Sequence, residues 1–272
     1  MIPARQIVTM LFGLCLLTLV VLGAGRQVPE QKESPALKPE RLQLPEQIET
    51  DIVTREAYCR WAIKPPVLDG KLDDKCWEEA VVIGQFASYW TKTSRAGTKA
   101  YLVWDDEALY YGATMNDNEL RAYGTKRNDT LWDGDVFEMF FKPSVEKPAY
   151  YEFQANPRAL IFECYFPKRG DYPKDFSKAP LLGNKAVVTL NGTLDHPGDR
   201  DQGWTVEGRI PWSAFEPTGK PKPGDEWRFA MCRYDYGPDG TQPVLMSSAP
   251  LTRPSFHQHE DYGKLRFEGP RK

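Results

Sequence analysis

From residue 53 onward the chain is a series of short apolar or alternating runs, and this pattern limits the fold more than any other feature. The runs are separated by glycine, proline, asparagine and aspartate, and they include DVFEMFF, YYEFQAN, LIFECYF and TVEGRIP. They are rich in the β-branched and aromatic residues that favour strands. Prolines lie between the runs and not inside them, as strands require. The pattern predicts an all-β fold, an antiparallel sandwich of the immunoglobulin-like or jelly-roll-like kind.

Three local elements can be predicted with defined bounds. Thr98–Asp105 and Ala108–Met115 flank the turn residues Asp105-Asp106-Glu107, which indicates a hairpin. Short helices are expected over Leu72–Ala80, where aspartates fall in the first turn, and over Trp212–Phe215, directly after Pro211.

The N-terminal part differs in composition from the rest. Residues 1–25 carry one cation, an apolar run and then Gly23-Ala24-Gly25, the pattern of a signal peptide; an uncleaved N-terminal anchor is the alternative. Residues 26–52 are rich in Pro, Glu and Gln and have no aromatic residue, so a flexible linker is expected there. Residues 53–272 form the predicted sandwich domain. The chain is therefore expected to be exported, and to contact a membrane only through residues 1–25 if they are retained.

Charge and cysteine content narrow the function. The formal net charge is −3 and no basic stripe occurs, which argues against nucleic-acid binding. The domain is expected to be a monomer. Besides Cys15 there are four cysteines, which suit export. Of the three possible disulfide arrangements, the expected one pairs Cys59 with Cys76 and Cys164 with Cys232, since the first of these closes a short loop.

Two neighbouring runs place polar residues on one face. Side chains alternate along a strand, so Glu152, Gln154 and Asn156 point to one side of YYEFQAN, and Glu138 points to one side of DVFEMFF. The two runs together can form the polar floor of a binding site. The alternative is a face that is simply solvated, as in many antiparallel sheets.

Six segments, in order, resemble the family 9 carbohydrate-binding modules. They are PVLDGKLDD from Pro66, VWDDEALY from Val103, WDGDVFEMF from Trp132, YEFQANP from Tyr151, GWTVE with IPW from Gly203, and the stretch from Phe256 to Leu265. The resemblance covers Pro65 to Phe267. It implies a β-sandwich that binds sugars without catalysis, often at chain ends, and that often carries structural calcium.

The resemblance also implies a sugar site, residue by residue. Trp132 takes the position of an aromatic residue that stacks on the apolar face of a sugar ring. Glu138 matches the carboxylate of the family's site and Asn156 matches its amide, and both can hydrogen-bond to hydroxyls. Two positions depart from the family pattern. Gln154 stands where an arginine is expected, and no aromatic residue occurs near Ser248, where the second ring of the clamp would fall.

Other ligands and functions stay open at this stage. Asp117, Asp133 and Asp135 are candidates for a structural calcium site, since oxygen-rich loops bind this ion. A domain that keeps the fold but has lost the sugar clamp would serve as a structural or protein-interaction module.

Two further alternatives concern chemistry. A glycosidase would need a carboxylate pair such as Glu138 with Glu152 or Glu207, but such pairs arise by chance among 38 acidic residues, and the chain is not expected to be an enzyme. A haem-binding electron-transfer domain would need a methionine and a histidine ligand. The candidates for these ligands are Met115, Met139, Met231, Met246, His196 and His257. His257-Gln258-His259 is also a possible metal pair, although the sequence offers no third ligand at a suitable spacing.

Overall fold

A computed structural model describes residues 46–47, 56–94 and 97–270. The predicted signal peptide or anchor lies outside these residues, as does the predicted linker except for Glu46–Gln47. Within the described part, no helix has both the length and the apolar character needed to cross a membrane.

The described part consists mainly of strands. The strands are β1 (Glu46–Gln47), β2 (Glu56–Trp61), β3 (Thr93–Ser94), β4 (Thr98–Trp104), β5 (Ala108–Asn116), β6 (Val136–Lys142), β7 (Tyr150–Ala155), β8 (Ile161–Phe166), β9 (Lys185–Asn191), β10 (Gly203–Pro211), β11 (Glu226–Tyr236), β12 (Pro243–Ser247) and β13 (Gly263–Phe267). The helical elements are α1 (Lys75–Glu79) and the 3₁₀ turns η1 (Leu131–Asp133), η2 (Phe176–Lys178), η3 (Trp212–Phe215) and η4 (His259–Asp261). Both predicted short helices are confirmed, the first in shortened form and the second as a 3₁₀ turn.

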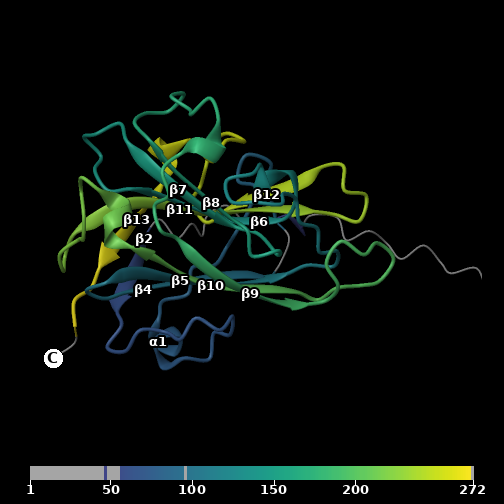
Figure 1. The fold of residues 1–272 in the computed structure, drawn as a ribbon, viewed down its shortest axis with the longest axis horizontal. Helices are drawn as coiled ribbons and strands as arrows, with labels where there is room; N and C mark the ends of the chain where they lie inside the picture. Colours follow the sequence, from purple (N-terminus) through teal and green to yellow (C-terminus); the bar gives the residue numbers. More distant parts are fainter. Residues whose placement is uncertain (1–45, 48–55, 95–96, 271–272) are drawn as a thin grey trace, which may run out of the picture. The chain divides into compact units, whose positions relative to one another are not determined.

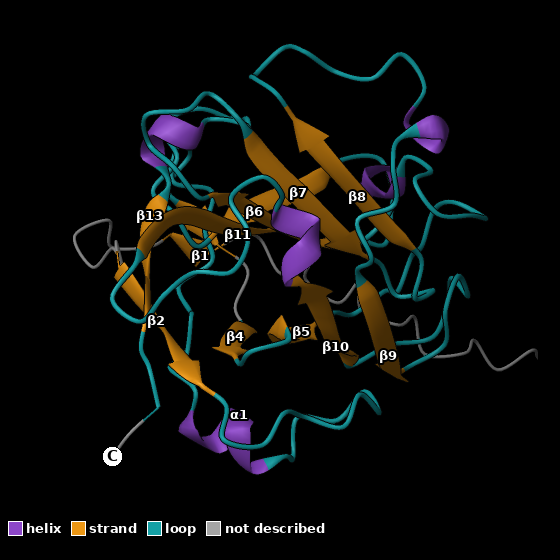
Figure 2. Ribbon diagram, turned by 60° about the vertical axis from the view of Figure 1, so that its left-hand side comes forward, coloured by secondary structure: helices purple, strands orange, loops and turns teal. Residues whose placement is uncertain are grey.

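One large sheet folds back on itself to give two layers (Figures 1 and 2). Its strand order is β8-β7-β6-β11-β13-β2-β4-β5-β10-β9, and β12 pairs with β11. The predicted hairpin is β4 with β5, where Trp104 pairs with Leu109 and the Asp105 carboxylate accepts hydrogen bonds from the N–H groups of Glu107 and Ala108. The all-β sandwich prediction is confirmed.

Strand β2 forms the corner between the layers. Its first four residues pair with β13 and its last two residues pair with β4, and both pairings are parallel. A strand that passes from one layer to the other in this way is a known means of turning a corner between packed sheets. The connection from β2 to β4 includes α1, and a parallel neighbour requires such a long crossover. The sheet is thus mixed at this corner and antiparallel elsewhere.

The main core lies between the two layers. It contains large rings such as Trp104, Phe141, Phe215 and Trp227, all of them buried. Burying one such side chain contributes ~1.5–3 kcal/mol to stability, so this cluster is the principal source of folding energy.

Both layers are also covered on their outer faces. Helix α1 places Trp77 over β4 and β5, and the Trp77 indole N–H donates to Oε1 of Glu207 on β10 at 2.8 Å. On the other layer, rings from the loops, including Phe256 and Tyr262, pack over β6, β7 and β11. Every residue of β6 and β7 is therefore buried. A solvated polar face on these strands, one of the two readings of the sequence, is not what the structure shows.

A polar link joins the two edge strands of the sheet. The Arg127 guanidinium lies 2.6 Å from Oε1 of Glu163 on β8, and it also donates to the carbonyl of Asn184, next to β9. The Asn184 N–H in turn donates to Oε2 of Glu163 at 2.8 Å. Backbone groups at the edges are thereby paired with side chains, which closes the sandwich at this seam.

Candidate functional site

The polar residues predicted to form a binding floor do share one face of one layer. Glu138 on β6 and Gln154 on β7 are cross-strand partners, and Glu152 lies two residues before Gln154. The Gln154 amide N–H₂ donates to Oε1 of Glu138 at 2.9 Å and also to Oε1 of Glu152. The sequence pattern thus correctly predicted that these three side chains share one face.

These three side chains are shielded from solvent, unlike those of an open binding surface. Glu138 is 2% exposed, Glu152 4% and Gln154 0%, because the outer aromatic layer covers them. Burial raises the pKa of Glu152 to about 8, against which the hydrogen bond from Gln154 acts only in part. Burial also raises the pKa of Glu138 well above its usual value, and the neighbouring Glu152 adds to this. One oxygen on this face, Oε1 of Gln154, is buried and has no hydrogen-bond partner among the described residues.

Trp132 lies at the edge of this face on η1. Its indole is half-buried and packs edge-on against Phe162 of β8, with ring centroids 5.4 Å apart, and against Phe176 of η2, 6.1 Å apart. The Trp132 carbonyl accepts a hydrogen bond from the Tyr236 hydroxyl at 2.9 Å. Glu138, Glu152 and Gln154 form what we call the polar row. Because Phe162 is the cross-strand partner of Gln154, Trp132 contacts a ring that neighbours this row.

The Asn156 amide makes its hydrogen bonds within the protein. Its Oδ1 accepts hydrogen bonds from the N–H groups of Arg158 and Leu160, and its Nδ2 donates to the Tyr123 carbonyl at 2.8 Å. It is fully buried. The side chain holds the loop after β7 against the segment that contains Tyr123.

The position expected for a second ring is occupied by a buried serine. Ser248 Oγ accepts a hydrogen bond from the N–H of Met231, and the Ser248 N–H donates to the Met231 carbonyl. A half-buried tryptophan from another segment, Trp90, packs on the same outer cluster, and Ala87 near it pairs with Ser247. Neither Trp90 nor Tyr123 was singled out from the sequence, because each reaches this region from a loop with no strand pattern.

The candidate calcium ligands are only partly brought together. Asp117 and Asp135 lie with Asp235 in a buried group in which one carboxylate oxygen of each residue is within 4.8 Å of those of the other two. Asp133 lies outside this group, is exposed, and accepts a hydrogen bond from the Thr130 hydroxyl.

A cation of the protein itself already lies among these carboxylates. Nη2 of the fully buried Arg233 is 2.8 Å from Oδ2 of Asp117 and 3.3 Å from Oδ1 of Asp235. Both oxygens of Asp135 accept backbone N–H groups, those of Arg121 and Tyr236, at 2.7 Å. In this arrangement the Arg233 guanidinium supplies positive charge to the carboxylates.

The predicted disulfides are not formed; all four cysteines are buried free thiols. Cys59 is in the core between the layers, whereas Cys76 lies on the outer side under α1. Cys164 on β8 and Cys232 on β11 are separated by β7 and β6. Three strand spacings amount to ~14 Å, whereas a disulfide requires Cα atoms within ~7 Å. The sequence could not reveal this separation because it does not give the strand order.

Among the residues proposed for other chemistries, Glu138 and Glu152 lie close together on the Gln154 amide, whereas Glu207 and the candidate haem ligands are separated from their proposed partners. Glu207 is on β10 beneath α1, whereas Glu138 is on the outer face of the opposite layer. The candidate methionines, Met115, Met139, Met231 and Met246, all lie in the core between the layers. His257 packs instead on the outer face against Phe140, and His196 is exposed. These positions bring no methionine and histidine together as a haem ligand pair.

The fold and the outer-face site define the chain as a two-layered β-sandwich domain. Residues 68–269 match the family model described as carbohydrate family 9 binding domain-like, and the chain belongs to this family. The recognition made from sequence motifs is thus confirmed.

Solved structures and relatives agree with this assignment. A family 9 carbohydrate-binding module from Caldicellulosiruptor kristjanssonii in complex with cellotriose is 19% identical, covers 79% of this chain and 95% of its own, and has a TM-score of 0.56. A putative carbohydrate-binding protein from Bacteroides uniformis is 16% identical, with coverages of 78% and 99% and a TM-score of 0.59. An endo-1,4-beta-xylanase A from Thermotoga neapolitana is 25% identical over 202 residues, which are 74% of this chain but only 17% of the xylanase.

Proposed function

We propose that this domain binds carbohydrate without catalysing a reaction on it, and that Trp132 is its main contact. Family membership supports the proposal, as do neighbouring structures solved with cellotriose and with glucose. The observation that carries it is the half-buried Trp132 ring, held edge-on by Phe162 and Phe176 at the rim of a polar row. A ring fixed in this way can cover the C–H face of a sugar with little loss of side-chain entropy.

Glu138, Gln154 and Asn156 are the proposed polar residues of the sugar site. Gln154 is the proposed direct contact, and the other two residues position the groups around it. Within the part of the chain that the structure describes, the buried Oε1 of Gln154 has no hydrogen-bond partner, and leaving such a group unpaired costs ~1–3 kcal/mol. A sugar hydroxyl reaching this row between the covering rings would satisfy that oxygen. Glu138 would hold the Gln154 amide, and Asn156 would hold the loop beside the ligand.

Export is a further part of the proposal. It is supported by the charged, apolar and small-residue pattern of residues 1–25. The partner outside the cell would be a polysaccharide or oligosaccharide.

Replacement of Trp132 with alanine is expected to weaken glycan binding at least about tenfold, because the stacking surface is lost. A glycan array followed by calorimetry on the whole chain measures this. Trp61→Ala is the matched control, since Trp61 is also half-buried and packs edge-on, against Trp104. If both variants fold and bind like the wild type, Trp132 is not the contact.

A second candidate function is that of a protein-interaction domain of the same fold. The buried Ser248 favours it, because this serine stands where the second ring of the sugar clamp was expected, and the covered Glu138 favours it because the outer rings separate this carboxyl from solvent. A folded wild-type domain that binds no glycan would support this function, and protein partners would then be sought by crosslinking.

A further inference from the structure

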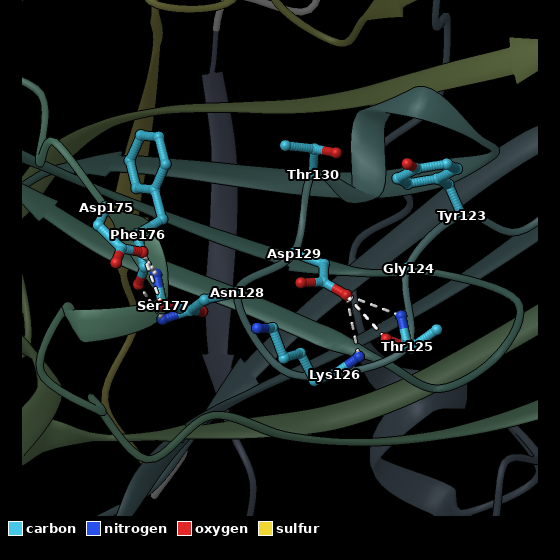
Figure 3. Close-up of a pocket in the computed structure, with 10 residues that line it drawn as sticks. All are labelled: Tyr123, Gly124, Thr125, Lys126, Asn128, Asp129, Thr130, Asp175, Phe176 and Ser177. Carbon is cyan, nitrogen blue, oxygen red and sulfur yellow. Dashed lines mark hydrogen bonds between the residues drawn. The ribbon is translucent and has the colours of Figure 1, made fainter.

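A pocket of about 490 Å³ opens beside the turn that carries Trp132. Its volume is within the range of ~300–1,000 Å³ that is typical of ligand pockets. Figure 3 shows its lining, which comes from the loop between β5 and β6 and from the start of η2: Tyr123, Gly124, Thr125, Lys126, Asn128, Asp129, Thr130, Asp175, Phe176 and Ser177.

One wall of the pocket is continuous with Trp132. Phe176 packs edge-on against Trp132 and also against Phe162, with centroids 5.1 Å apart. Its carbonyl accepts a hydrogen bond from Nδ2 of Asn128, whose Oδ1 accepts from the N–H of Glu163 on β8. The wall is therefore fixed to the sheet and not free to collapse into the pocket.

Tyr123 lies at the opposite end of the pocket from Phe176 (Figure 3). Its side chain is 52% exposed, whereas its carbonyl is held by Asn156. Gly134, next to the Trp132 turn, approaches this segment so closely that an added Cβ would lie 2.6 Å from the Tyr123 backbone nitrogen. The segment carrying Tyr123 and the turn carrying Trp132 are thus locked together while the tyrosine ring remains available.

Between the two rings lie groups that suit sugar hydroxyls. Oδ2 of Asp129 accepts hydrogen bonds from the N–H groups of Thr125 and Lys126, and both bonds, the one from Thr125 more strongly, lower the pKa of this carboxyl. Its Oδ1 accepts no hydrogen bond from the residues that the structure describes, and Lys126 lies beside it in Figure 3. An ionised acceptor next to an ammonium donor can bind two adjacent hydroxyls.

We propose that this pocket is a second sugar subsite, which takes the neighbouring ring of an oligosaccharide whose first ring covers Trp132. The inference rests on the proposed carbohydrate function and extends it to ligands of two or more rings. Tyr123 supplies the apolar contact, and Asp129 and Lys126 bind hydroxyls. Asp129 and Asp175 make a neutral sugar the fitting ligand and disfavour an acidic one.

The test compares ligands of different length on the whole chain. Affinities for glucose and cellotriose, and for xylose and xylotriose, are measured by calorimetry. Of cellotriose and xylotriose, the one that the wild type binds more tightly is expected to bind about tenfold more tightly than the corresponding monosaccharide, glucose or xylose. Tyr123→Ala should abolish that difference while leaving monosaccharide binding unchanged. Lys126→Met, which removes the ammonium without touching the ring, should reduce the difference as well.

The control is Tyr58→Ala, which removes a tyrosine that is 38% exposed on β2, and it should keep the full difference. Equal wild-type affinity for one and three rings, or a Tyr123→Ala variant that retains the preference, overturns the second subsite while the proposed function stands. A wild type that binds none of the four sugars, nor any glycan on the array, overturns the carbohydrate function and the subsite with it.

Discussion

Replacing Arg233 with methionine is expected to lower the free energy of unfolding by about 3–5 kcal/mol, because a buried ion cluster then loses its cation. Arg233 is fully buried and links the layers, since Nη1 donates to the Thr98 hydroxyl and Nη2 to Asp117. Without it, Asp117, Asp135 and Asp235 face one another with no positive charge between them. Even beside Arg233, the pKa of Asp117 is raised to about 7, because burial and, to a smaller extent, Asp235 outweigh the lowering effect of the guanidinium.

Urea denaturation at pH 7 measures this loss. Arg266→Met is the matched control, because Arg266 forms surface ion pairs with Glu56 and Glu226, and such pairs contribute ~0–1 kcal/mol. A loss of stability no larger than that of the control would contradict the role given to Arg233.

Calcium provides a second readout of the same cluster. Addition of calcium should partly restore the stability of Arg233→Met, because three carboxylates without a guanidinium can ligate the ion. The double variant Arg233→Met, Asp235→Asn should lose that rescue. If calcium stabilises the wild type and Asp235→Asn alone removes the effect, then the guanidinium does not fill the place of the ion.

The local pattern of the chain was enough to predict the fold class and several elements. The β4–β5 hairpin follows from strand runs on either side of aspartates, and its turn is closed by the Asp105 carboxylate. The pairing of Glu138 with Gln154 follows from alternation on two successive runs. Such features depend on neighbours in sequence, and the sequence reports them directly.

What the sequence could not supply was long-range packing. The prediction that Glu138 and Gln154 lie on one face was right, but nothing local indicates that Phe256 and Tyr262, more than a hundred residues later, cover that face. The partner of Asp117 was likewise hidden, because Arg233 reaches it from a strand of the other layer.

Because Glu152 is buried beside Glu138 and has a raised pKa, we expect the free energy of unfolding to fall as pH rises. The folded state holds Glu152 with a pKa of about 8, whereas an unfolded glutamate has a pKa of ~4.3, so between these values the folded state binds more protons than the unfolded state. Unfolding free energy then decreases with rising pH across this window. The contribution is fully present below the unfolded pKa and is lost as pH rises through about 8.

Replacement of Glu152 with glutamine should remove that dependence. The amide keeps an oxygen that can accept the hydrogen bond from Gln154 but cannot ionise. We expect Glu152→Gln to match the wild type near pH 5 and to be more stable by on the order of 2 kcal/mol at pH 8.5. Denaturation curves at several pH values measure the difference between the two proteins.

Comparing the variant with the wild type isolates the contribution of Glu152 to the pH dependence of stability from the contributions of the other titratable groups. Asp117, with a pKa raised to about 7, and His257, whose pKa burial lowers to about 4, titrate in both proteins and largely cancel in the difference. Glu138, Tyr234, Tyr262, Cys164 and Cys232 also surround Glu152. Glu146→Gln, at an exposed position, is the control and should leave the wild-type profile unchanged. A Glu152→Gln variant less stable than the wild type at pH 8.5 would mean that this carboxylate is ionised in the folded state, held by a partner that favours its charge.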